Sequence, residues 1–401
     1  MDTTDVKTTD IDAAVIPFRI EVAESALEDL HSRLRSARLP EPLPGDGWDS
    51  GVPITVLRDL VERWLRNDWR ATQERLNALP QVVTRIEGQT IHAVHVRSAH
   101  PDATPLVLMH GWPGSFLEFE ELIGPLTDPE AYGGDAADAF HVVIPSHPGF
   151  GFSTPLAGPG WTVERTAGAF LELMTRLGYD GFAVQGGDHG AAVAPEIARQ
   201  APDRVMGVHV NGSLGSFVGE VDAETTASLT PIEQDRLRRV GEFMQREFGY
   251  IAIQGTRPGL IGAMAADSPV AQLAWIYDKL QAWTYPADAD AVDVVGERFV
   301  LENAALYWLT ASAGSSAQVV YALNNAWGDP KPSSGVPTAV IVFAHDVGLR
   351  FAEEPHHEIV RWTDVEGRGG HFAALEEPEL LVGDVRAFFG SLRGSVRSSR
   401  G

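Results

Sequence analysis

The chain has 401 residues, enough for two or three folding units, and 44% of them are hydrophobic, which indicates a globular protein. It contains no cysteine, which excludes disulfides, thiolate catalysis and cysteine-ligated zinc and is compatible with the cytoplasm. The formal net charge of −24 disfavours nucleic acid and anionic membranes as partners, and no apolar run reaches the roughly 18 residues of a membrane span, so we expect a soluble chain.

The first segments of the chain predict a helical extension over residues 1–80. Residues 1–14 are polar and acidic, unlike a signal peptide, and predict a loose tail. Apolar residues at helical spacing then predict helices over 24–36, 54–66 and 69–76.

From residue 81 to residue 213, strand and helix patterns alternate, which predicts a mostly parallel, doubly wound sheet. We expect strands at 81–86, 90–97, 106–109, 141–144, 182–185 and 204–210, and helices at 116–126, 163–177 and 191–200. These residues would form the first part of an α/β core.

The segment after the strand at 106–109 is His110-Gly111-Trp112-Pro113-Gly114-Ser115. A loop at this place can supply one backbone donor of an oxyanion hole, and we expect that donor to be the N–H of Trp112. Pro113 has no N–H and restricts the loop. The alternative is an ordinary Gly/Pro turn. The position at a strand end, two strand-helix units before the next motif, favours the functional interpretation.

The segment Val184-Gln185-Gly186-Gly187-Asp188-His189-Gly190 has the pattern of a nucleophile elbow, with aspartate where an esterase has serine. The flanking Gly186 and Gly190 suit a turn that leaves no room for side chains there. Aspartate, with a reference pKa of about 3.9, is ionised at neutral pH. Its attack on carbon makes an alkyl ester, so the substrate should be an alkylating electrophile. The alternative is an aspartate that caps the next helix.

Residues 214–325 interrupt the alternation with helical patterns and predict a cap over the carboxyl edge of the sheet, where ligands bind in open α/β sheets. The core resumes over 326–401, with strands at 337–344 and 358–364 and a helix at 378–391. The basic end, 393–401, should fray.

Two residues of this second core segment complete a catalytic set. Asp346 follows the strand at 337–344, and His371 lies in Gly369-Gly370-His371-Phe372. The order nucleophile, acid, histidine is that of α/β-hydrolases, in which the acid orients the imidazole. The alternatives are a surface turn for Asp346 and a structural role for His371, since the chain has 13 histidines.

From about Ile16 to Leu392, the chain resembles the microsomal-type epoxide hydrolases. Besides the motifs above, the resemblance rests on Arg38-Leu39-Pro40, Gly51-Val52-Pro53, Asp68-Trp69-Arg70, Leu76-Asn77-Ala78-Leu79-Pro80, Ser146-His147-Pro148-Gly149-Phe150-Gly151-Phe152-Ser153 and Arg368-Gly369-Gly370-His371-Phe372-Ala373-Ala374. It implies an α/β-hydrolase fold and an enzyme that converts an epoxide and water to a vicinal diol through an aspartyl ester, without metal or cofactor.

The resemblance also implies a role for particular residues. The nucleophile falls on Asp188, the orienting acid on Asp346 and the base on His371. The oxyanion-hole loop falls on His110 to Pro113, and the motifs themselves indicate the N–H groups of Trp112 and His189 as its donors. Two ring-opening tyrosines fall on Tyr250 and Tyr321. From pattern alone the tyrosines stay undecided, because the cap region holds five: Tyr250, Tyr277, Tyr285, Tyr307 and Tyr321.

The chain departs from the mammalian members of this family in three ways. They carry a membrane anchor that is absent here, which implies a soluble, cytoplasmic enzyme. They have glutamate at the position of Asp346 and tryptophan at that of His189, beside the nucleophile.

Two other functions remain open from the sequence. A haloalkane dehalogenase would use the same ester chemistry and release halide, and a non-catalytic binding protein of this fold would bind a ligand without turnover. The identity of the epoxide, the stereochemistry and any homo-oligomer are also open.

Overall fold

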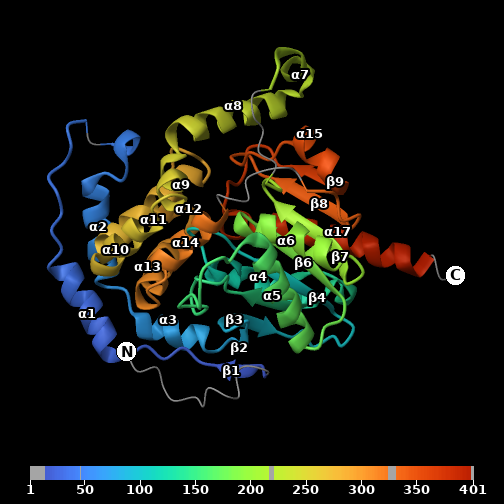
Figure 1. Cartoon of the computed structure of the whole chain (residues 1–401), viewed down its shortest axis with the longest axis horizontal. Helices are drawn as coiled ribbons and strands as arrows, with labels where there is room; N and C mark the ends of the chain where they lie inside the picture. Colours follow the sequence, from blue (N-terminus) through green and yellow to red (C-terminus); the bar gives the residue numbers. More distant parts are fainter. Residues whose placement is uncertain (1–13, 46, 216–220, 324–330, 399–401) are drawn as a thin grey trace.

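The computed structural model describes residues 14–45, 47–215, 221–323 and 331–398, with the backbone alone for 323 and 394–398. Within this part of the chain, nine strands form a sheet in the order β1-β2-β3-β5-β4-β6-β7-β8-β9 (Figure 1). The strands are β1 (Ile16–Phe18), β2 (Gln81–Ile86), β3 (Gln89–Val96), β4 (Thr104–Met109), β5 (Phe140–Pro145), β6 (Phe182–Gly187), β7 (Val205–Asn211), β8 (Pro337–Val342) and β9 (Glu358–Asp364).

Strand direction divides this sheet into two parts. The strands β1, β2 and β3 pair antiparallel with one another, and β3 is also antiparallel to β5. From β5 through β4 to β9, all neighbouring strands are parallel. This arrangement confirms the mostly parallel sheet that the alternation predicts. The sequence pattern does not predict β1, because three residues are too few to show the alternation of a strand.

Alternate residues of the central strands face opposite sides of the sheet. In β4, Leu106 and Leu108 belong to one hydrophobic cluster, whereas Val107 and Met109 belong to another. The first cluster is covered by α4 (Glu120–Thr127) and α17 (Pro378–Ser398), and the second by α5 (Val163–Arg176) and α6 (His189–Gln200). Helices therefore cover both faces, as in the α/β-hydrolase fold.

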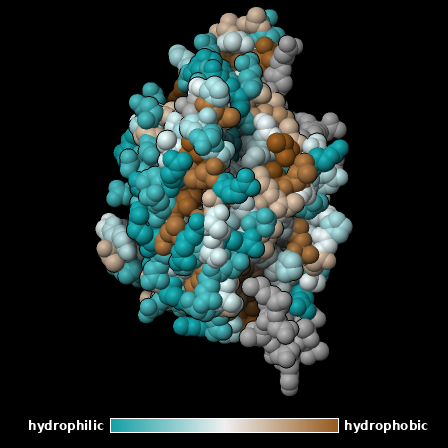
Figure 2. Space-filling view, turned by 90° about the vertical axis from the view of Figure 1, so that its left-hand side faces the viewer, coloured by the Kyte–Doolittle hydropathy of each residue, from teal (hydrophilic) through white to brown (hydrophobic). Residues whose placement is uncertain are grey.

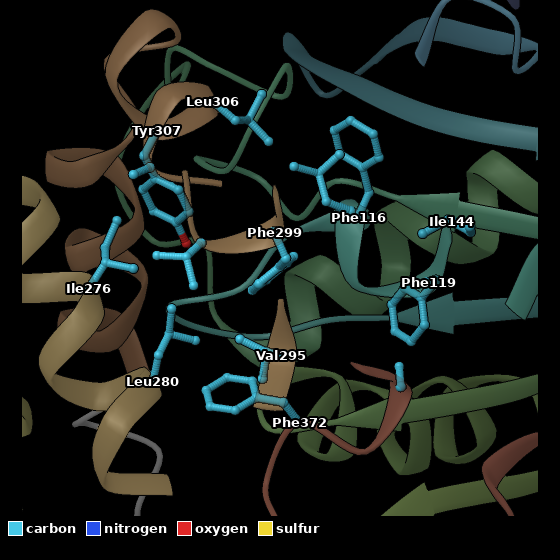
Figure 3. Close-up of a cluster of buried hydrophobic side chains, with 14 of the residues drawn as sticks. Phe116, Phe119, Ile144, Ile276, Leu280, Val295, Phe299, Leu306, Tyr307 and Phe372 are labelled. Atoms are coloured by element: carbon cyan, nitrogen blue, oxygen red, sulfur yellow. The ribbon is translucent and has the colours of Figure 1, made fainter. Parts of the chain in front are cut away.

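Every element described between β7 and β8 is a helix, as the sequence predicts for this block. These elements are α7 (Ala223–Ser228), α8 (Pro231–Arg246), α9 (Gly249–Gln254), α10 (Pro258–Asp267), α11 (Pro269–Trp283), α12 (Ala291–Val295), α13 (Glu297–Leu309) and α14 (Ala313–Leu323). Figure 3 shows Leu280 of α11 and Phe299 of α13 in the same cluster as Phe372 of the core. The helical block and the sheet thus share one hydrophobic core.

The helices expected near the N-terminus are confirmed as α1 (Glu24–Arg35), α2 (Ile54–Trp64) and α3 (Trp69–Leu76). They lie beside α10, α11 and α13 at the left of Figure 1. The N-terminus of α3 is capped by Asp68, whose side chain accepts a hydrogen bond from the backbone N–H of Arg70.

Charged residues join these N-terminal helices to α13. Arg63 of α2 contacts Glu297 at 2.9 Å. Glu302, which is 5% exposed, pairs with Arg75 of α3 and accepts a hydrogen bond of 2.7 Å from the hydroxyl of Thr72. Buried carboxylates need such partners, so these contacts fix α3 against α13.

The remaining elements are short and lie in connections. They are η1 (Trp48–Ser50), η2 (Phe116–Phe119), η3 (Pro129–Tyr132), η4 (Ala136–Asp138), α15 (Arg350–Glu353), η5 (Glu354–His356) and α16 (Ala373–Glu376). Of these, η2 and α16 matter for the site, because they follow the His110 loop and His371.

The expectation of a frayed end is wrong as far as residue 398, because α17 continues to Ser398. Arg393 explains part of this extension, since its guanidinium contacts Asp138 at 2.8 Å and Thr104 at 3.2 Å. The tail expected over 1–14 lies outside the described residues except for residue 14.

The outer surface of the N-terminal helices and the cap is mostly hydrophilic, with hydrophobic side chains in narrow bands (Figure 2). Among the helices that the structure describes, none combines the length and apolar character needed to cross a membrane.

Candidate active site

Asp188 lies at the turn between β6 and α6, with a positive φ of 52°. The turn requires glycine on both sides. A Cβ on Gly190 would lie 2.2 Å from the backbone oxygen of Met109, and a Cβ on Gly186 would lie 2.3 Å from the carbonyl of Gly190. The sequence prediction of a tight strand-to-helix turn with Asp188 at its apex therefore agrees with the structure.

Three groups surround the carboxylate of Asp188. The backbone N–H of Trp112 donates to Oδ1 at 2.9 Å, His371 Nε2 lies 3.5 Å from Oδ2, and His189 Nε2 lies 3.9 Å from Oδ1. Burial alone would raise the pKa of Asp188, but His371, His189 and the Trp112 N–H together hold it below the ordinary value. The carboxylate is therefore ionised at neutral pH.

His371 lies between Asp188 and Asp346. Its Nδ1 is 3.8 Å from Oδ2 of Asp346, and its backbone N–H donates to the oxygen of Trp283 in the cap at 3.0 Å. Burial lowers the pKa of His371, but the two carboxylates outweigh burial and raise it well above the ordinary value. The sequence expectation that these three side chains meet is consistent with this geometry.

Asp346 is 5% exposed and lies in the turn after β8. Its Oδ1 accepts a hydrogen bond of 2.7 Å from the backbone N–H of Val347, and its Oδ2 faces His371. Burial would raise the pKa of Asp346, but His371 and this N–H keep it below the ordinary value. A Cβ on Gly212 would lie 2.6 Å from the same Oδ2, so a glycine at the end of β7 makes room for the acid.

The loop that carries Trp112 is held from the cap. Asn303 donates to the oxygen of Pro113 and the Tyr307 hydroxyl donates to the oxygen of Gly114, both at 2.8 Å. The other expected oxyanion donor, the backbone N–H of His189, begins α6 and so has no partner within that helix.

The tyrosines expected at the site occupy different surroundings. Tyr250 of α9 stacks on the ring of Trp112, with 4.9 Å between ring centroids. Burial raises its pKa well above the ordinary value, and the charge of Asp188 adds to the rise, so the phenol is protonated. Tyr321 of α14 is 42% exposed, and no described residue forms a hydrogen bond or ring contact with it. The structure thus brings Tyr250, but not Tyr321, against Trp112, whose backbone N–H binds Asp188.

Another cap tyrosine, Tyr307 of α13, is 1% exposed. Burial raises its pKa well above the ordinary value, with Glu118 and Asp188 adding to the rise. Pattern alone cannot select Tyr307 among the five cap tyrosines.

Two glutamates near His371 were not predicted from the sequence as site residues. Glu118 of η2 lines a cavity together with Asp188 and His371, and burial raises its pKa to about 8. Glu376 accepts hydrogen bonds of 2.9 Å from the backbone N–H groups of Phe372 and Tyr285. Burial raises the pKa of Glu376 to about 7. The signal for Glu118 was an ionisable residue inside the apolar run at 116–119.

Metal binding has no candidate in the described ranges, because no three His, Asp or Glu side chains there are arranged to hold an ion.

Comparison with known proteins gives related matches over most of the chain. Residues 15–119 match the family model described as the epoxide hydrolase N terminus, and residues 104–254 match the model described as the alpha/beta hydrolase fold. A protein of Stigmatella aurantiaca assigned as an epoxide hydrolase is 42% identical over 384 residues, which cover 94% of this chain and 86% of that protein. Epoxide hydrolase 1 of Oryctolagus cuniculus is 34% identical over 413 residues, which cover 94% of this chain and 89% of that protein.

A solved structure extends this similarity to three dimensions. The juvenile hormone epoxide hydrolase of the silkworm Bombyx mori superposes with a TM-score of 0.85 at 29% identity, and the match covers 97% of each chain.

Proposed function

The chain belongs to the epoxide hydrolase family, and we propose that it opens an epoxide with the carboxylate of Asp188. One observation carries this proposal. The same carboxylate has one oxygen at the backbone N–H of Trp112 and the other facing His371. A carboxylate held in this way is ionised and positioned both to attack carbon and to be released afterwards by water.

In the first step, an oxygen of Asp188 attacks an epoxide carbon while the ring C–O bond breaks. The ring oxygen leaves as an alkoxide and takes a proton from a phenol. We propose Tyr250 as a donor, because it is protonated and packs on Trp112. The resemblance indicates Tyr321 as the second donor, and we keep this proposal because the hydroxyl of Tyr307, the other candidate, already donates to the oxygen of Gly114.

In the second step, His371 takes a proton from water, and the hydroxide attacks the ester carbonyl of Asp188. The N–H groups of Trp112 and His189 would stabilise the oxyanion. Collapse breaks the bond to the alkyl oxygen, which takes the proton held by His371 and leaves as the diol. The proton left on the Asp188 carboxyl group then returns to the phenolate, which restores the carboxylate and the phenol.

Formation of the ester also prepares His371 for its task. In the free protein, Asp188 and Asp346 both raise the pKa of His371. The ester removes the charge of Asp188, so only Asp346 continues to favour the imidazolium. The histidine therefore becomes a better proton acceptor at the stage that needs one.

We further propose a division into an N-terminal extension at 1–80, a cap at 214–325 and a core at 81–213 and 326–401. The contacts of Trp283, Asn303 and Tyr307 with the catalytic loops support a cap that closes the site. A cytoplasmic location is proposed from composition, since the chain has no cysteine.

The experiment that tests this mechanism is a His371→Gln variant. It should open the epoxide once and then stall, because the carboxylate attacks without a base whereas water does not. Intact-mass spectrometry should show one substrate added to the protein, and digestion should map it to the peptide with Asp188. His100→Gln is the matched control, because His100 faces Glu130 at the surface. Unmodified His371→Gln protein, after incubation with an epoxide that the wild type hydrolyses, would contradict the mechanism.

A further inference from the structure

A small cavity opens beside the carboxylate of Asp188, enclosed between β4, η2 and the His371 loop. Its volume is about 20 Å³, counted as the space open to the centre of a water-sized sphere. One water molecule needs about 10–15 Å³ on this measure. Glu118, Asp188, His371 and Asn211 provide polar groups in its wall. The cavity therefore has both the size and the partners to hold a single water.

Glu118 reaches this cavity because of the loop before it. The hydroxyl oxygen of Ser115 accepts a hydrogen bond from the backbone N–H of Leu117 at the start of η2, and this bond fixes the turn that carries Glu118. A Cβ on Gly114 would lie 1.4 Å from Oε1 of Glu118, so the carboxyl group packs directly against the Gly114 backbone. A larger residue at position 114 would therefore displace this carboxyl group from its place.

The neighbours of Glu118 do not neutralise it by an ion pair. Burial raises its pKa to about 8, the charge of Asp188 adds to the rise, and His371 opposes it. Glu118 is therefore largely protonated at neutral pH, with one oxygen that accepts and one O–H that donates. A neutral carboxyl group can bind water in this cavity without adding a third negative charge beside Asp188 and Asp346.

We propose that this cavity holds the water that hydrolyses the ester and that Glu118 orients that water; this rests on the proposed function. The water would donate one hydrogen to His371 Nε2 and the other to an oxygen of Glu118, which directs its oxygen toward Cγ of Asp188. In the reaction, the first of these protons moves to His371, the new C–O bond forms at Cγ, and Glu118 keeps its own proton.

The place of the cavity supports a role in the second step alone. Its wall includes neither Tyr250 nor Tyr321, the phenols proposed to hold the epoxide oxygen. The epoxide and the water would therefore occupy different places around the same carboxylate. A change at Glu118 should affect hydrolysis of the ester and leave its formation intact.

The test is single-turnover kinetics on Glu118→Leu, with ester and diol followed by rapid quench and mass spectrometry. Ester formation should stay within about twofold of wild type, and ester hydrolysis should slow by about tenfold or more, the effect of one lost hydrogen bond to a reacting group. Glu118→Gln, which can still accept and donate, should recover much of the hydrolysis rate. Glu121→Gln is the matched control, because Glu121 is exposed and pairs with Arg298 outside the cavity.

Two results would overturn the inference. One is hydrolysis at the wild-type rate in folded Glu118→Leu, and the other is an equal loss in both steps, which indicates a structural role. If the leucine variant does not fold, Glu118→Met gives the same test with a more adaptable side chain. Absence of any ester on Asp188 in the His371→Gln variant would instead refute the proposed function, so the two failures are distinguishable.

Discussion

At the carboxyl edge of the sheet, Asp188 is positioned by backbone turns, whereas in the helical cap Tyr250 is positioned by ring packing. The elbow leaves no space for a Cβ at Gly186 or Gly190. Tyr250, in contrast, stacks on the face of Trp112 and packs at a tilt against Trp283, with 4.9 and 5.2 Å between ring centroids. Backbone turns tolerate no larger residue, but stacked rings can shift together.

This difference indicates how the two regions divide the work. The sheet edge fixes the bond-making groups within the geometry that covalent chemistry needs. The cap supplies proton donors and walls that other side chains can reshape. We therefore expect substitutions at the edge to stop the reaction and substitutions in the cap to change its rate and its choice of epoxide.

The largest effect is expected at the sheet edge. Asp188→Ala removes the proposed nucleophile, so diol formation should fall by at least about 10⁴-fold, to the background rate. The unfolding temperature should change little, because the side chain faces a cavity. Asp203→Ala, at an exposed turn, is the control. If folded Asp188→Ala still forms diol at a measurable fraction of the wild-type rate, Asp188 is not the nucleophile.

A smaller and graded effect is expected in the cap. Tyr250→Phe should slow ester formation by roughly 10²–10⁴-fold, the usual contribution of a general acid, or less if a second phenol compensates. Tyr321→Phe should slow it as well, and the double variant should nearly stop it. Tyr307→Phe should have the weakest effect, because its hydroxyl acts through Gly114.

Rapid-quench measurement of ester formation decides among these tyrosines. If Tyr321→Phe forms the ester at the wild-type rate and Tyr307→Phe forms it more slowly, the second donor is Tyr307. The resemblance then assigns the wrong tyrosine as second donor. Circular dichroism and melting curves should show that each variant keeps the fold.

The smallest effect is a shift with pH. Hydrolysis of the ester needs neutral His371, so its rate should fall by up to about tenfold for each pH unit below the pKa of His371 in the ester. Ester formation needs ionised Asp188, whose pKa lies below the ordinary value, and should persist at the same pH. The fraction of protein held as ester during turnover should therefore rise as the pH falls. If the fraction of protein held as ester instead decreases as the pH is lowered, ester formation is the step that fails first.

The comparison of edge and cap also explains what the sequence could predict. Asp188 and Asp346 follow strand patterns, and Asp188 and His371 lie beside glycines; such signals are local. The strands at 81–86 and 358–364 match β2 and β9 to the residue for the same reason. Local patterns specify backbone geometry, and backbone geometry places these side chains.

The cap residues could not be chosen in this way. Tyr250, Tyr307 and Tyr321 all lie on helices, and only packing between segments distant in sequence decides which of them reaches Asp188. Glu376 was not predicted for a similar reason, since nothing in its local sequence indicates the burial that raises its pKa, and the apolar neighbours of Glu118 indicate burial but not its approach to His371. The three-residue strand β1 depends on pairing with β2, more than sixty residues later.

The ion pair between Arg75 and Glu302 has a consequence for synthesis of the chain. The two residues are 227 positions apart, and Arg63 and Glu297 are 234 apart. At about 5–20 residues per second on the ribosome, α2 and α3 emerge roughly 10–45 seconds before their partner helix α13. During that interval, the apolar side of α2, with Leu57, Leu60 and Trp64, has no final partner. The N-terminal helices of this protein are therefore made first and can complete their packing only after α13 has been synthesised.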